Sequence, residues 1–191
     1  TGILKAQLLK GETLVDLTGG FGIDVLFFAK EFEKVIYVER NLKLLEIVKH
    51  NFQILNSTNI EFHNQNAEDF LKEKLNSKSE KIDVVYLDPA RRNPEQKKIF
   101  QLSDCQPDVL DLKNDLLKFA KTILLKTSPI LDIHLASKEL QNVEKIWVIS
   151  LQNECKEVLY QIGQNKTQNP DIEAISLRKN KPSQHFIFNF E

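Results

Sequence analysis

A glycine-rich turn between an apolar strand pattern and an apolar helix pattern constrains this chain more than any other feature. Thr13–Thr18 has the composition of a buried strand, Gly19–Gly22 form the turn, and Val25–Lys30 follow a helical pattern. Glycines in such a turn let the backbone bend tightly and let a ligand approach the chain itself. Glu39 follows at the end of a second strand-like run, at a spacing that suits a carboxylate for ribose hydroxyls. This order predicts a nucleotide-binding α/β unit.

The details of the turn indicate which nucleotide is bound. A dinucleotide fingerprint G-x-G-x-x-G would start at Gly20 and would require a third glycine where Val25 stands. The G-x-x-x-x-G-K-[ST] phosphate loop is absent from the sequence. An acidic strand end followed by Gly-x-Gly, here Asp16 to Gly22, resembles the first motif of the class I S-adenosylmethionine-dependent methyltransferases. An NAD-dependent enzyme therefore ranks last, and a purely structural turn stays open.

The remaining pattern predicts alternating strands and helices. We expect an α/β fold with a doubly wound, mostly parallel seven-stranded sheet, as in Rossmann-like methyltransferases, and an antiparallel C-terminal strand. In such sheets, polar residues at the carboxyl ends of the strands meet at one edge. Beyond the first two strands, strands are expected at 60–63, 82–87, 123–126, 146–150, 172–177 and 185–190, and helices at 2–11, 42–55, 64–75, 109–120, 130–140 and 154–162.

Composition limits the classes of function. The 191 residues suffice for one domain, 1–191, and the net charge of −1 argues against an autonomous polyanion binder. No apolar run is long enough to span a membrane, and no secretory leader is recognised. Cys105, Cys155 and the four histidines are scattered, which predicts reduced thiols and no metal site. Because the sequence begins at Thr1 and has no methionine, we expect a domain excised from a longer cytoplasmic protein.

The methyltransferase resemblance implies a binding site for S-adenosyl-L-methionine. The turn would hold the methionine part of the cofactor, and Glu39 would accept hydrogen bonds from both ribose hydroxyls. Arg40 or Asn41 would flank the adenine. Asn66 and Ala67 stand where the family contacts the adenine amino group. The implied cofactor-binding residues are Asp16, Thr18, Gly19, Gly20, Phe21, Gly22, Asp24, Glu39, Arg40, Asn66, Ala67 and Asp88.

The segment Asp88-Pro89-Ala90-Arg91-Arg92 indicates the chemistry. Family members that act on exocyclic amines typically carry Asp/Asn-Pro-Pro-aromatic here, and the acid and a proline carbonyl accept hydrogen bonds from the amine. Ala90 and Arg91 replace the second proline and the aromatic residue, and a guanidinium stacks on a base or clamps a phosphate. The resemblance thus implies Asp88, Pro89 and Arg91 as the catalytic residues.

Together with Lys126-Thr127-Ser128-Pro129, this segment is similar to a bacterial subgroup of methyltransferases that carries an appended THUMP-like domain. A looser likeness links the turn to guanine-N2 methylases of the trimethylguanosine synthase type. Both imply methylation of a tRNA or rRNA base, with an RNA-binding domain outside this sequence, and neither implies a membrane or a metal as partner. The alternatives are a small-molecule or protein methyltransferase, in which Glu95–Pro107 would form a lid over a small substrate, and a non-catalytic cofactor-binding module.

Overall fold

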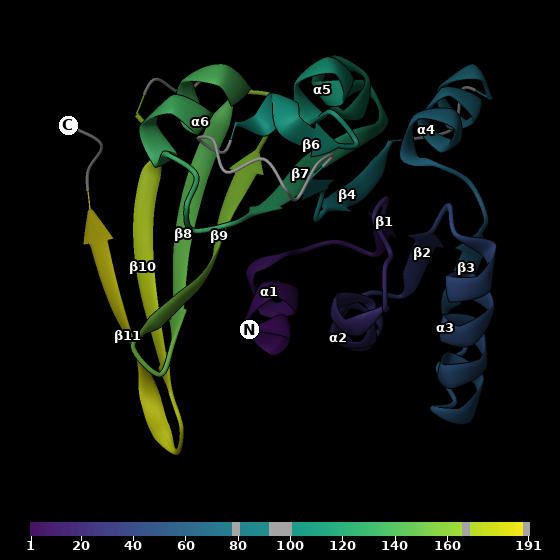
Figure 1. The fold of residues 1–191 in the computed structure, drawn as a ribbon, viewed down its shortest axis with the longest axis horizontal. Coiled ribbons are helices and arrows are strands. Elements are labelled where there is room, and N and C mark those ends of the chain that lie inside the picture. Colours follow the sequence, from purple (N-terminus) through teal and green to yellow (C-terminus); the bar gives the residue numbers. More distant parts are fainter. Residues whose placement is uncertain (78–80, 92–100, 166–168, 189–191) are drawn as a thin grey trace. The chain divides into compact units, whose positions relative to one another are not determined.

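The computed structural model describes residues 1–77, 81–91, 101–165 and 169–188 (Figure 1). The chain divides into two compact units. The N-terminal unit contains Gly2–Leu87 and Lys118–Lys121, and the C-terminal unit contains mainly Asp88–Leu117 and the described part of 122–191.

The N-terminal unit alternates helices and strands as the sequence predicts. Its strands pair in parallel in the order β4-β1-β2-β3. This arrangement is the parallel half of the expected sheet, and it brings the carboxyl ends of β1, β2 and β3 to one edge. The elements are α1 (Gly2–Leu8), β1 (Thr13–Asp16), α2 (Ile23–Glu31), β2 (Lys34–Val38), α3 (Leu42–Ile54), β3 (Ile60–His63), α4 (Ala67–Asn76) and β4 (Ile82–Leu87).

Apolar residues of the strands and of one face of each helix make the core of this unit. Val15 and Val85 pair across β1 and β4 and are fully buried, and Phe28 of α2 packs edge-on against Tyr86 of β4 at 5.0 Å between ring centroids. Helix α3 buries Leu45, Val48 and Phe52, the spacing that predicted one apolar face. Asn41 and Asn66 cap α3 and α4 through their side-chain oxygens, so both helices begin directly after strand ends.

The C-terminal unit has strands of mixed direction. Its strands follow the order β11-β10-β8-β9-β7, with β9 antiparallel to both neighbours, β10 parallel to β8, and β11 antiparallel to β10 (Figure 1). Strands β5 and β6 form a separate, two-stranded antiparallel sheet. The elements are β5 (Ala90–Arg91), η1 (Leu102–Asp104), β6 (Cys105–Gln106), α5 (Val109–Phe119), β7 (Ala120–Thr127), α6 (Ile133–Leu140), β8 (Val143–Leu151), β9 (Glu154–Ile162), β10 (Asp171–Arg178) and β11 (Lys181–Phe188).

The helix expected over residues 154–162 is wrong, because this segment is strand β9. Cys155, Val158, Leu159 and Ile162 match a helical spacing, but 158–160 are buried without alternation because β9 is covered on both faces. In a short run of apolar residues, no alternation of apolar and polar positions is present to distinguish a buried strand from a buried helix. The hairpin that reverses the chain uses Gln152 and Asn153, both with positive φ (54° and 65°), instead of the more recognisable Asn-Gly pair.

Other expectations agree with the structure. The fold class is confirmed: the sheet is mostly parallel, with antiparallel strands toward the C-terminus, and β9 adds a strand that the expected sheet lacked. The two tail strands are β10 and β11, joined by a turn at Lys179–Asn180 in which Asn180 has a φ of 58°. Of the loop proposed as a lid, residues 95–100 lie outside the described residues, and the rest forms η1 and β6.

Candidate active site

The three glycines of the turn are required for different reasons. A methyl group on Gly19 would lie 2.3 Å from the ring of Tyr37, and one on Gly22 would lie 2.9 Å from Val48 and Phe52. At Gly20, which has a φ of +54°, the nearest atom would be the carbonyl oxygen of Thr18 at 3.6 Å. Gly19 and Gly22 therefore serve packing, while Gly20 borders open space and lets a ligand approach the backbone.

Asp16 stabilises the start of the turn through hydrogen bonds to Thr18. Its carboxylate is 1% exposed and accepts hydrogen bonds from the backbone N–H of Thr18 (2.8 Å) and from the Thr18 hydroxyl (3.2 Å). Helix α2 then starts at Ile23 after Gly22, which has a left-handed conformation and no side chain to cap the helix. The first-turn N–H groups and the helix dipole make this end favourable for a carboxylate. Phe21 is 77% exposed beside it.

Glu39 is linked to the same turn. Its two carboxylate oxygens accept hydrogen bonds from the backbone N–H of Gly20 (3.0 Å) and of Asn41 (2.8 Å). Each carboxylate oxygen offers two acceptor positions, so these bonds leave the group able to accept hydroxyl donors as well. Tyr37 donates its hydroxyl to the Gly20 carbonyl at 2.5 Å. Burial, followed by the charges of Glu39 and Asp16, raises the pKa of Tyr37, so the hydroxyl remains a donor at neutral pH.

Asp24, predicted from the family likeness to bind the cofactor, belongs to a polar cluster with two residues that sequence reasoning missed. Its carboxylate pairs with the ammonium group of Lys5 (2.8 Å) and accepts the Tyr86 hydroxyl (2.6 Å). Lys5 is only 2% exposed, although a lysine on a helix this short would be expected at the surface. This cluster ties α1 and β4 to the start of α2.

The residues predicted to contact adenine follow β2 and β3. Arg40 is exposed, and Ala67 is buried in the first turn of α4. The side-chain oxygen of Asn66 caps α4 by accepting the Asp69 N–H at 2.7 Å. Asn64, which the sequence analysis did not single out, donates to the carbonyl oxygens of Glu39 (2.9 Å) and Arg40 (3.1 Å) and so orients this loop.

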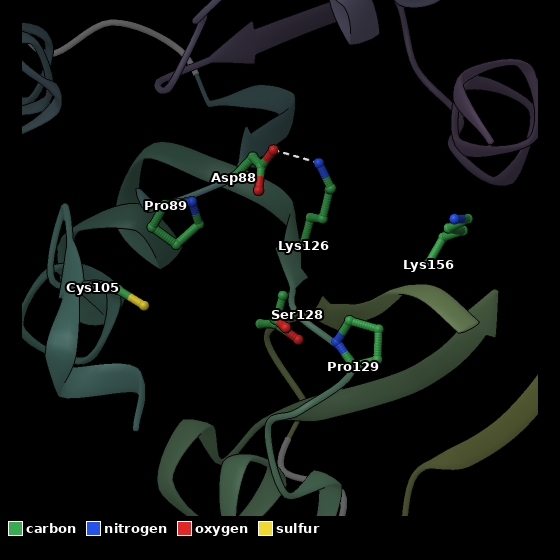
Figure 2. A pocket seen from close by; sticks show the side chains of 8 residues that line it. Asp88, Pro89, Cys105, Lys126, Ser128, Pro129 and Lys156 are labelled. Carbon is green, nitrogen blue, oxygen red and sulfur yellow. Dashed lines mark hydrogen bonds and ion pairs between the residues drawn. The ribbon is translucent and has the colours of Figure 1, made fainter. Parts of the chain in front are cut away.

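The C-terminal unit contains a separate pocket of about 250 Å³. Figure 2 shows the side chains of Asp88 and Lys126 directed at one another, and their carboxylate and ammonium groups form an ion pair. Asp88 follows directly after β4 in the chain, and Lys126 lies near the end of β7. The pocket is lined by Asp88, Pro89, Cys105, Lys126, Thr127, Ser128, Pro129 and Lys156.

Two of the three predicted catalytic residues, Asp88 and Pro89, thus line one pocket. Arg91 forms a backbone ladder with Cys105 in the small sheet, and its side chain lies outside the described part of the structure, as does Arg92. Lys126 was quoted only as part of a motif, and Lys156 lies on the strand predicted as a helix. Among the described residues, no group of His, Cys, Asp and Glu is arranged to hold a metal ion, and no helix is long and apolar enough to cross a membrane.

A parallel α/β unit with this turn, an acidic strand end and an Asp-Pro pocket defines a Rossmann-like, S-adenosylmethionine-dependent methyltransferase. The structure is similar to a putative methyltransferase from Porphyromonas gingivalis (TM-score 0.84, 29% identity), covering 98% of this chain and 46% of that protein. An O-methyltransferase from Bacillus cereus in complex with SAH has the same fold (TM-score 0.63, 14% identity, 85% of this chain and 79% of that one). So has an rRNA methylase from Streptococcus thermophilus (TM-score 0.56, 16% identity, 87% and 94%).

The sequence matches the model of the RNA cap guanine-N2 methyltransferase family over residues 11–181, so the chain belongs to that family. A search of curated proteins found no match. The predicted enzyme class and the predicted cofactor are confirmed by the family. The chain spans less than half the length of the Porphyromonas protein.

Proposed function

We propose that this chain is the catalytic part of an RNA methyltransferase that modifies the exocyclic amine of guanine. The pocket that joins Asp88 and Pro89 carries this proposal, because a carboxylate beside a proline is the arrangement that accepts hydrogen bonds from an amine. The description of the family, RNA cap guanine-N2 methyltransferase, supports guanine in RNA as the substrate. A pocket of about 250 Å³ is smaller than those that typically enclose drug-sized ligands, about 300–1,000 Å³, and suits one base.

The N-terminal unit would hold the cofactor. The open side of Gly20 and the uncapped start of α2 fit the methionine part of S-adenosylmethionine, and Glu39 fits the ribose. When bound, the cofactor supplies a methyl group on a sulfonium, which is a good leaving group. The protein therefore needs little acid–base chemistry and contributes chiefly alignment.

Asp88 would provide that alignment for the acceptor. Its carboxylate accepts an N–H of the guanine amine, which fixes the direction of the nitrogen lone pair. In the transfer, a nitrogen–carbon bond forms, the sulfur–carbon bond breaks, and the amine loses one proton to solvent. Pro89 keeps Asp88 out of helical geometry, so the acid projects into the pocket instead of continuing an element.

The RNA-binding surface would lie largely outside this sequence. The net charge of −1 offers no broad attraction to a polyanion, and the Porphyromonas relative is more than twice as long as the part matched here. We therefore propose that an additional domain, of the THUMP-like kind expected from the sequence, captures the RNA in the full protein. A cytoplasmic location fits two cysteines that form no disulfide in the described part of the chain.

The experiment is methyl transfer from S-adenosylmethionine to RNA, with digestion to nucleosides and mass spectrometry. We expect N2-methylguanosine with the unaltered protein, and at least a hundredfold less with Asp88→Ala, a scale typical of losing a positioned catalytic group. Calorimetry should give the same cofactor affinity for both. Equal loss of cofactor binding and transfer would remove Asp88 from catalysis, and methylation of protein or small molecules alone would refute the RNA substrate.

A further inference from the structure

Lys126 belongs to a motif that the proposed function does not yet explain, Lys126-Thr127-Ser128-Pro129. Its ammonium group pairs with the carboxylate of Asp88, the residue proposed to hold the acceptor amine. Both side chains line the same pocket and both are partly shielded, with exposed fractions of 24% for Lys126 and 41% for Asp88. The two charges thus present a fixed pattern of donor and acceptor to whatever enters.

That pattern matches the pairing edge of guanine. An ammonium group only donates hydrogen bonds, and a carboxylate only accepts them. The pairing edge of guanine has the acceptor O6, the donor N1–H and the donor N2–H₂ in sequence, whereas adenine has a donor amine where guanine has O6. The Lys126 ammonium group beside the two oxygens of Asp88 is therefore complementary to guanine, whereas the amine of adenine would place a donor against the ammonium donor.

We propose that Lys126 is a specificity-determining residue, which donates to O6 of guanine while Asp88 accepts from N1–H and the 2-amino group. This inference rests on the proposed function, since it concerns the base that Asp88 holds. An ammonium group has three donors and a carboxylate has about four acceptor positions, so the ion pair does not by itself exhaust either group. The pair can therefore stay formed while both side chains contact the base.

Two other roles for Lys126 would give different behaviour. If Lys126 binds a phosphate of the RNA, as Lys156 on the other side of the pocket could, its removal weakens all nucleotides equally. If it only orients Asp88, its removal weakens discrimination by the carboxylate. A test must therefore compare nucleotides that differ by single groups on the base edge.

Nucleotide binding provides this test without requiring methyl transfer. Dissociation constants would be measured by NMR titration for GMP, for 6-thioguanosine monophosphate and for inosine monophosphate, with S-adenosylhomocysteine present. The thio analogue replaces O6 by sulfur, a weak acceptor, and the inosine nucleotide lacks only the 2-amino group. The variants are Lys126→Met and, as a matched control, Lys138→Met, which removes an exposed lysine of the same unit outside the pocket.

We expect the unaltered protein and Lys138→Met to bind GMP about tenfold more tightly than the thio analogue, the scale of one hydrogen bond to a charged group. Lys126→Met should bind these two within twofold of each other and still prefer GMP to the inosine nucleotide. The inference is overturned if Lys126→Met loses both the preference for GMP over the thio analogue and the preference for GMP over the inosine nucleotide, or if it loses neither. It is also overturned if the unaltered protein shows no preference among the three nucleotides. The absence of nucleotide binding overturns it as well, whereas binding with the expected preferences but without methyl transfer to RNA contradicts only the proposed function.

Discussion

Replacing Glu39 by alanine tests whether this carboxylate holds a ribose or only braces the glycine turn. The side chain accepts the backbone N–H of Gly20 at 3.0 Å and that of Asn41 at 2.8 Å, so it has a structural role independent of any ligand. A drop in cofactor affinity alone would not separate the two roles. The substitution must therefore be compared with one that loosens the turn and leaves the carboxylate in place.

Tyr37→Phe is that comparison. It removes the hydroxyl that donates to the Gly20 carbonyl at 2.5 Å and keeps the ring that packs on Phe62 at 5.5 Å between centroids. The loss of one such bond costs about 0.5–1.5 kcal/mol of the free energy of unfolding. Glu39→Ala loses two bonds to a charged acceptor in a half-buried place, about 3 kcal/mol in total at the lower end of the range for such bonds. For a chain of this size these values lower Tm by roughly 2–4 °C per kcal/mol.

Cofactor affinity then separates the roles. If Glu39 accepts both ribose hydroxyls, Glu39→Ala raises the calorimetric Kd for S-adenosylmethionine more than tenfold, since a bond to a charged group is worth about 1.5–3 kcal/mol. Tyr37→Phe should change the Kd less than threefold. An unchanged Kd in Glu39→Ala, or an equal rise in both variants, would refute the ribose assignment.

Two further predictions concern stability. Asp83 accepts hydrogen bonds from two backbone N–H groups and from Lys121, which chiefly lowers its pKa, so Asp83→Ala should cost about 1–3 kcal/mol at neutral pH by urea unfolding. The pKa of Asp83 is lower in the folded state than its unfolded value of about 3.9, so its stabilising contribution is complete above pH 3.9. The difference in free energy of unfolding between the unaltered protein and Asp83→Ala should therefore shrink as the pH falls through the folded pKa. A difference that stays constant down to acid pH would contradict this. Gly19→Ala places a methyl group 2.3 Å from the ring of Tyr37, whereas Gly20→Ala costs only the strain of the left-handed conformation, about 1–2 kcal/mol. Gly19→Ala should therefore lower Tm more than Gly20→Ala. The reverse order in a thermal melt would show that the packing argument fails.

Local patterns were sufficient to predict the elements around the glycine turn. The strand before the turn, the turn itself and the helix after it each have a period or a composition that few alternatives share. The polar residues Asp16, Glu39 and Asp88 could be placed at strand ends for the same reason, because a strand of this class ends where its apolar run ends. Strand β9 could not be predicted, since burial on both faces removes the alternation that would distinguish it.

The partners of the site residues were decided by tertiary structure. Lys5 and Asp24 are 19 residues apart in the sequence, and Asn64 is 25 residues from Glu39, whose carbonyl oxygen it contacts. Lys126 and Asp88, which form the ion pair, are 38 residues apart. Such pairings depend on strand order and register, which bring distant segments together, and no local pattern contains them. The sequence by itself therefore determined which elements form and which chemical groups stand at their ends. Only the packed fold decided that a buried lysine supports the glycine turn, and that the acid of the Asp-Pro segment is paired with a cation.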